Sequence, residues 1–101
     1  MIRHIVMFAF LPEAEGRTRA ENAAIARGML EALPQKIDWI RNPAVALRMD
    51  GAESANFDLI LSADFDSMED LNRYLVHPDH KAVGEFMRTV RRERACVDFE
   101  V

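Results

Sequence analysis

The sequence has few of the residues that brace small secreted or membrane-bound proteins. It contains a single cysteine, Cys96, so no disulfide can form within the chain. The longest N-terminal apolar run, Ile5–Leu11, is far too short for a membrane span and lacks the small-residue cleavage site of a signal peptide. Neither a glycine-rich phosphate loop nor a nucleophile elbow is present. We therefore predict a cytoplasmic protein that does not contact a membrane.

An excess of positive charge is also lacking. The chain has 13 Lys and Arg against 17 Asp and Glu, a formal net charge of −4, which argues against nucleic-acid binding. Half of the residues are hydrophobic and 30% are charged, as in folded globular proteins. With 101 residues the chain has room for one domain, residues 1–101. Without a disulfide, such a small domain depends on its core, a cofactor or a partner chain.

The first third of the chain predicts a strand followed by a helix. Residues 2–10 alternate with period two and are apolar on both sides, as expected for a strand covered on both faces. Thr18 and Glu21 have the spacing of a capping box at a helix start, and we expect Pro34 to end that helix. Its predicted core stripe contains Ile25, Ala26, Met29, Leu30 and Leu33.

The rest of the chain predicts three strands and two helices. The strands are expected at 44–49, 57–65 and 94–101. A capping signal at Ser67 starts a helix that ends before Pro78, because the residue before a proline is disfavoured in the helical region. Pro78 suits the first turn of a new helix, whose apolar stripe is Val83, Phe86, Met87 and Val90.

This order of elements predicts an α+β, ferredoxin-like split βαβ fold, a four-stranded antiparallel sheet with helices on one face. The opposite sheet face would then also be apolar, and a soluble monomer rarely exposes such a patch. We therefore expect a homodimer in which two sheets meet. The residues expected on that face are Ile5, Met7, Ala9, Ile60, Ala95, Val97 and Phe99.

The histidines and the tyrosine are the best candidates for chemistry near neutral pH. Tyr74 ends one predicted helix and His80 opens the next, so both can converge on His4 if the helices cover its strand face. A neutral imidazole and a phenol in an apolar hollow can exchange protons with a phenolic or enolic substrate. Each residue also has an ordinary structural role. His77 can be a turn or cap residue, His80 can cap its helix or donate a hydrogen bond to a buried carbonyl, and Tyr74 can be a core aromatic.

A metal site is not predicted. His77, Asp79 and His80 are ligand types, but their spacing straddles a proline and no cysteine cluster accompanies them.

Other polar residues near the C-terminus have weaker signals. Cys96 lies inside a predicted strand and is expected to be a small buried hydrophobe. Asp98 alternates with it, and either orients a histidine or lies in solvent at the sheet edge. A basic run is interpreted as surface charge at a helix C-terminus; it consists of Arg88, Arg91, Arg92 and Arg94.

Several segments together resemble the stress-responsive A/B barrel (Dabb) family. They are the opening Arg3-His4-Ile5-Val6-Met7-Phe8, the pair Phe57-Asp58-Leu59-Ile60 and Phe65-Asp66-Ser67, the central Tyr74-Leu75-Val76-His77-Pro78-Asp79-His80, and the closing Val97-Asp98-Phe99-Glu100. The resemblance covers essentially the whole chain and implies a dimeric α+β barrel, in agreement with the patterning.

The resemblance is compatible with three functions. The family includes stress-induced proteins without an assigned reaction, which favours a domain that binds a small hydrophobic or phenolic molecule between helices and sheet. It also includes a cofactor-independent polyketide cyclase, whose acid/base pair matches Tyr74 and His80. An isomerase-like or cyclase-like enzyme without a cofactor is therefore the alternative, and a cofactor-free monooxygenase is a third. The expected pocket residues are His4, Val6, Phe8, Leu61 and Asp98.

Overall fold

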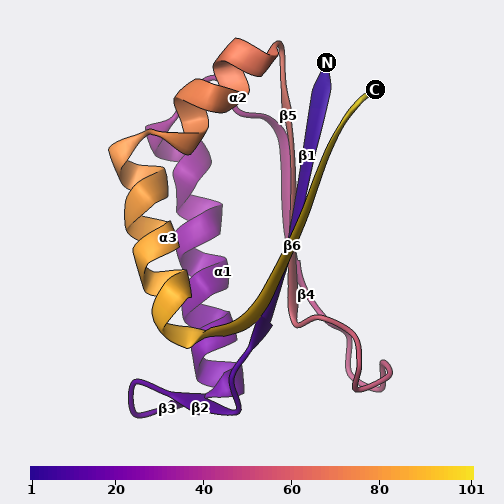
Figure 1. Cartoon of the computed structure of the whole chain (residues 1–101), viewed down its shortest axis with the longest axis vertical. Coiled ribbons are helices and arrows are strands. Elements are labelled where there is room, and N and C mark those ends of the chain that lie inside the picture. The colour runs from indigo at the N-terminus through magenta and orange to yellow at the C-terminus, as the bar shows by residue number, and fades with distance from the viewer.

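The computed structural model describes residues 1–101 as a layer of helices against one face of an antiparallel sheet (Figure 1). The four strands are ordered β4-β5-β1-β6, and all neighbours are antiparallel. Their bounds are β1 Ile2–Phe10, β4 Arg41–Leu47, β5 Leu59–Phe65 and β6 Arg91–Glu100. The helices are α1 Arg19–Lys36, α2 Met68–Leu75 and α3 Pro78–Val90, and a small hairpin contains β2 Glu13–Ala14 and β3 Arg17–Thr18. The predicted architecture is confirmed, and no helix has the length and apolarity needed to cross a membrane.

The core lies between the central strands and the helices. On β1, Val6, Phe8 and Phe10 are buried on the helix-facing side, and Leu59, Leu61, Ala63 and Phe65 of β5 lie beside them. His4 is also buried on this face of β1. The pattern of period two therefore places one histidine among the core side chains.

Helix α1 begins where the sequence predicts but ends later. Thr18 and Glu21 form the full capping box. Pro34 lies inside the helix rather than ending it, and the Ile37 N–H still bonds to the Leu33 carbonyl. The buried side chains at Leu33 and Ile37 anchor this last turn, which offsets the hydrogen bond that a proline cannot donate.

The buried stripe of α1 also differs from the prediction. It contains Ala23, Ala26, Leu30 and Leu33, whereas Ile25 is exposed and Met29 only partly buried. The small alanines allow close packing on the sheet, so this face of the helix is buried and the face that contains the larger Ile25 is exposed.

Strand β4 runs over Arg41–Leu47 rather than 44–49 and contains Pro43. This position is tolerated because β4 is an edge strand and its pairing with β5 is irregular between Arg41 and Ala44. The neighbouring Asn42 adopts a positive φ of 48° within this irregularity. Strand β5 begins at Leu59, two residues later than predicted.

The break between α2 and α3 occurs at His77-Pro78 as predicted. Ser67 caps α2 by accepting from the Asp70 N–H, and His77 caps α3 by accepting at Nδ1 from the Asp79 N–H at 3.1 Å. Pro78 occupies the first turn of α3, where a missing N–H costs nothing.

The sheet is wider than the helix layer that covers it. Strand β6 follows α3 directly at Arg91, three residues earlier than predicted, and forms the edge beside β1. Its helix-side residues Arg94, Cys96 and Asp98 are exposed, so the prediction of a buried Cys96 is wrong. The helices do not reach over this edge strand.

The opposite sheet face is apolar across adjacent strands. Ile60 pairs with Met7, and Met7 pairs with Ala95, while Ile5 pairs with Val97. Most of these side chains are partly or largely exposed, but Ala9 is buried, contrary to the prediction. Ala9 lies next to the register shift between β1 and β6.

A buried carboxylate on this opposite face links strands β5, β1 and β4 by hydrogen bonds. Asp64 of β5 is only 2% exposed. It accepts from Arg3 Nε at 2.8 Å and Nη2 at 3.1 Å, and from Asn42 Nδ2 at 3.0 Å. These hydrogen bonds, chiefly from Arg3, lower the pKa of Asp64 to about 2.

Acid should therefore weaken the fold through Asp64. Because its folded pKa of about 2 lies below the ordinary 3.8, its stabilisation is complete above about pH 4 and is lost as pH falls toward 2. Asp64→Asn should lower stability at pH 7 and flatten the dependence of unfolding free energy on pH, measured by urea denaturation from pH 2 to 7. Asp66→Asn, which removes an exposed partner of Arg41, is the control and should retain the wild-type slope.

Candidate functional site

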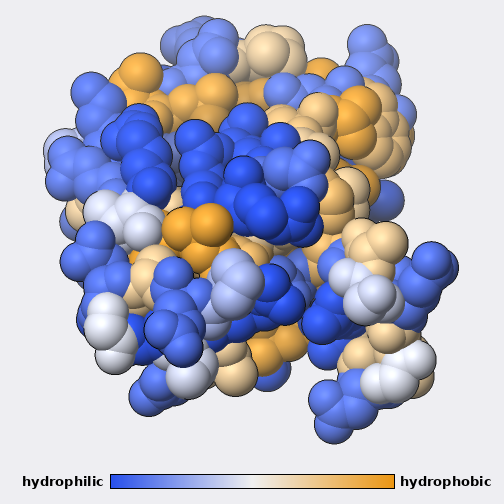
Figure 2. Space-filling view, turned by 60° about the horizontal axis from the view of Figure 1, so that its bottom comes forward, coloured by the Kyte–Doolittle hydropathy of each residue, from blue (hydrophilic) through white to orange (hydrophobic).

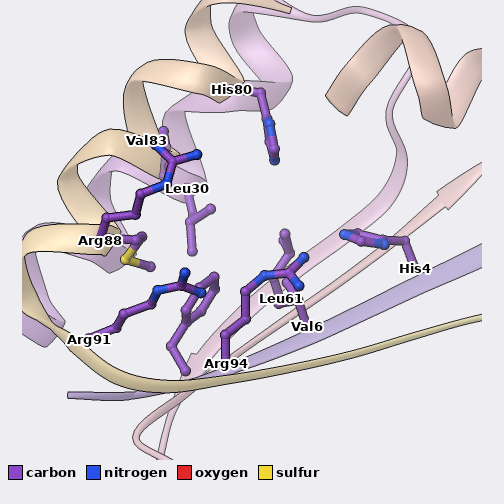
Figure 3. Close-up of a pocket in the computed structure, with 12 residues that line it drawn as sticks. His4, Val6, Leu30, Leu61, His80, Val83, Arg88, Arg91 and Arg94 are labelled. Atoms are coloured by element: carbon purple, nitrogen blue, oxygen red, sulfur yellow. The ribbon is translucent and has the colours of Figure 1, made fainter. Parts of the chain in front are cut away.

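A cavity of about 310 Å³ opens between α3 and the β1–β6 side of the sheet. It exists because the helix layer stops short of β6. Its apolar wall contains Val6, Phe8, Leu30, Leu61, Val83 and Met87, with Gly84 beside them. Its polar side chains are His4, His80, Arg88, Arg91 and Arg94, and no carboxylate lines it. Figure 3 shows the labelled side chains pointing toward this common space.

His80 enters the cavity from the first turn of α3 (Figure 3). Its Nδ1 lies 3.1 Å from the Leu75 carbonyl oxygen. Since a carbonyl only accepts, Nδ1 donates the proton, and Nε2 of the neutral ring carries a lone pair. Burial lowers the pKa of His80 below 6.5, and neighbouring groups such as Arg94 lower it further, while the hydrogen bond to the Leu75 carbonyl acts in the opposite direction. His80 is therefore a neutral imidazole at pH 7 and is equipped to accept a proton.

His4 lines the cavity from β1, and β6 orients its ring. His4 pairs with Asp98 in the β1–β6 register, and its Nδ1 lies 2.5 Å from Asp98 Oδ1. Donation from Nδ1 to this carboxylate leaves Nε2 as the second nitrogen available to a ligand. Asp98 itself does not line the cavity, so any effect it has on a ligand acts through His4.

Tyr74 packs behind His80 rather than lining the cavity. It ends α2, is 1% exposed, and its ring centroid lies 4.4 Å from that of His80 and 5.0 Å from that of Phe65. Burial raises the pKa of Tyr74 far above its ordinary value of 10.0, so the phenol stays protonated. The structure thus brings Tyr74 and His80 together, as the break between their helices indicated, with only the imidazole facing the space.

Four of the five expected pocket residues line the cavity, namely His4, Val6, Phe8 and Leu61. The arginines were not expected there. Arg88, Arg91 and Arg94 recur at intervals of three residues, from the last turn of α3 across its C-cap into β6. Arg88, Arg92 and Arg94 are exposed, in agreement with the interpretation as surface charge, but Arg88 and Arg94, together with the partly buried Arg91, also line this cavity, whereas Arg92 pairs with Glu93 at 3.2 Å. The spacing was visible in the sequence, but the absence of a loop before β6 was not.

One cluster could offer three ligand atoms to a metal ion: His4, Cys96 and Asp98 lie with these atoms within 4.8 Å of one another. The His4–Asp98 separation of 2.5 Å is that of a hydrogen bond, whereas two ligands of a tetrahedral ion are about 3.3 Å apart. Desolvation and the Asp98 carboxylate raise the pKa of the Cys96 thiol, which disfavours the thiolate that a metal needs. This geometry favours a hydrogen-bonded cluster. His77, Asp79 and His80 do not bring their ligand atoms together in this way.

The strand order and the single helix layer define a ferredoxin-like α+β domain, here with a ligand-sized cavity on its helix side. The chain belongs to the stress responsive A/B barrel domain (Dabb) family, whose model matches residues 2–101. We found no significant match among curated protein sequences.

Two solved structures show how closely the fold is shared. A dimeric, ferredoxin-like protein of unknown function from Bacteroides fragilis is 32% identical, with a TM-score of 0.81 over 99% of this chain and 95% of that chain. Another from Thermobifida fusca is 27% identical, with a TM-score of 0.83 over 99% and 90% of the two chains. A hydroxynitrile lyase from Passiflora edulis, 11% identical with a TM-score of 0.78 over 99% and 92%, shares the fold alone.

Proposed function

We propose that this domain binds a small hydrophobic or phenolic molecule in the cavity between α3 and the sheet. The observation that carries the proposal is the cavity itself: about 310 Å³ bounded by six apolar side chains, two imidazoles and three arginines. Ligand sites are typically concave, mostly apolar and furnished with a few polar groups that fix orientation, with volumes of roughly 300–1,000 Å³. A volume at the lower end of that range suits an aromatic molecule of up to three rings.

Gly84 offers a way to fill the cavity without disturbing the core. It lines the cavity on α3, and a Cβ built at this position meets no atom within 4 Å. Gly84→Leu should therefore abolish binding of the neutral fluorescent probe N-phenyl-1-naphthylamine, which the wild-type chain should bind with enhanced, blue-shifted emission. The variant should also be about 1 kcal/mol more stable, because leucine favours a helix more than glycine does.

Gly28→Leu is the matched control, since Gly28 also lies in a helix, at an exposed position with open space around its Cβ. This variant should gain stability and keep wild-type probe binding. Equal probe binding by the Gly84→Leu variant would show that the probe, and by inference the ligand, does not occupy the cavity.

We propose further that the domain acts as a homodimer through the outer face of its sheet. The face is apolar across adjacent strands, with Met7, Ile60 and Val97 all more than one third exposed in a single chain. Exposed contiguous apolar faces of this kind normally mark an interface. The relatives from B. fragilis and T. fusca are themselves dimeric, which supports the same assembly for this chain.

Two isoleucines of equal exposure test the interface. Ile60, on the outer sheet face, is 38% exposed, and Ile25, on the outer side of α1, is 39% exposed. Ile60→Glu should yield monomers in sedimentation velocity at micromolar concentration, since burying an unpaired charge costs several kcal/mol. Ile25→Glu should remain dimeric. A wild-type chain that sediments as a stable monomer would overturn the assembly proposed here.

A second function, acid/base catalysis by His80 without a cofactor, is favoured by one observation. The Nδ1 bond to Leu75 holds the neutral tautomer, so the Nε2 lone pair is available in a partly dry, apolar space. A positioned base of this kind can remove a proton from an enolisable or phenolic substrate, as a cyclase or isomerase requires. Tyr74, whose phenol stays protonated, packs against the ring of His80 without facing the cavity, so its part in this function is to position the imidazole.

The generic probe 5-nitrobenzisoxazole reports such a base. Loss of its C3 proton breaks the N–O bond and releases 2-cyano-4-nitrophenolate, which is followed by absorbance. His80→Gln should lower the rate by about 10²-fold or more, because that is the usual contribution of a general base. The wild-type rate should rise with pH to a midpoint below 6.5. His77→Asn, which keeps a capping acceptor for α3, is the control and should keep the rate; an unchanged rate for His80→Gln would exclude His80 as the base.

A further inference from the structure

Three arginines at the cavity lack the oxygen partners that the other arginines of the chain have. Arg88, Arg91 and Arg94 form no ion pair and no hydrogen bond to an oxygen atom of the chain, although it contains 17 carboxylate side chains. Each of the other eight arginines is engaged, through an ion pair or through a side-chain hydrogen bond; they are Arg3, Arg17, Arg19, Arg27, Arg41, Arg48, Arg73 and Arg92. The guanidinium groups without an oxygen partner thus lie together at the wall of this cavity, where they also border an open surface pocket lined by Arg92 and Glu93.

Their placement gives the cavity a polar gradient. Figure 3 shows Arg88 and Arg91 on one side of the space, His80 and His4 on the other, and Arg94 between them. Apolar side chains such as Val6 and Leu61 lie in the middle. Figure 2, which brings the lower end of the molecule forward, shows strongly hydrophilic side chains gathered on this end with hydrophobic atoms beside them.

We infer that the cavity selects an organic carboxylate, with its anionic group on Arg88, Arg91 and Arg94 and its apolar body along the wall toward the histidines. This inference rests on the proposed function and names the ligand class for the same site. A guanidinium presents a planar fork of donors that matches a carboxylate, and it is less strongly hydrated than an ammonium. A cavity that lacks acidic side chains leaves these donors to an external anion.

The net charge of the protein supports a local attraction of anions. The chain carries a formal net charge of −4, so its overall field does not attract anions. A local cluster of three cations without counter-ions repels itself, and a bound carboxylate removes that repulsion. Attraction of an anion is therefore local to these three arginines, at the cavity and at the open pocket beside it that Arg92 and Glu93 complete.

Three naphthalene derivatives with nearly the same body test the charge preference. They are 1-naphthoate, neutral 1-naphthalenemethanol and cationic 1-naphthylmethylamine, each measured by displacement of N-phenyl-1-naphthylamine from the wild-type chain. Naphthoate should displace the probe at the lowest concentration and the amine at the highest. The advantage of naphthoate over the alcohol should shrink between 20 and 500 mM NaCl, since salt screens partly exposed charges.

The double variant Arg88→Gln/Arg91→Gln should weaken naphthoate binding about tenfold or more and leave the alcohol nearly unchanged, because one hydrogen bond to a charged group contributes about a factor of ten or more to affinity. Arg92→Gln, at a neighbouring arginine paired with Glu93, is the control and should keep the wild-type preference. Equal affinity for naphthoate and the alcohol, or equal loss in the control, would overturn the carboxylate assignment while leaving the binding proposal intact. Failure of the wild type to bind the probe and all three compounds would overturn both.

Discussion

The helix layer covers only part of one sheet face and leaves β6 uncovered. The rest of the site depends on this difference in width. Helix α1 packs toward β4 and β5, and α3 packs against α1 rather than reaching across β6. The helix-side residues of β6 therefore stay exposed, and a cavity remains between α3 and β1. Because no helix covers β6, the space beside it is a cavity rather than a filled part of the core.

Within that cavity, hydrogen bonds to the backbone and to a neighbouring strand fix the orientation of the two imidazoles, in addition to side-chain packing. The His77-Pro78 break leaves the Leu75 carbonyl near the start of α3, where it accepts from His80 Nδ1. The β1–β6 register places Asp98 opposite His4. In both rings Nδ1 is occupied, so Nε2 is the nitrogen left for a ligand. The same helix break and strand pairing that build the fold thus also set the tautomers of the site.

Much of the fold followed from local signals in the sequence. The capping residues Thr18 and Ser67, the break at Pro78 and the alternation of β1 each report on a few neighbouring residues, and these predictions are confirmed. The errors arose where distant contacts decide. Pro34 stays helical because Ile37 is buried, and Cys96 is exposed because no helix reaches β6. The sequence pattern carries no information on the width of a helix layer.

The arginines illustrate the same limit for the site and connect its two proposed functions. In sequence they lie at the C-terminal end of α3, where basic residues commonly face solvent. The immediate turn into β6 brings Arg91 and Arg94 to the cavity that Arg88 lines from α3. Arg94 lowers the pKa of His80 while its charge is unbalanced. A carboxylate bound to these arginines would offset that charge and raise the pKa of His80 toward its ordinary value, which makes the imidazole a stronger base. Under the two proposals, the ligand that suits the arginines would also raise the pKa of His80, so that binding and proton transfer in this cavity would reinforce each other.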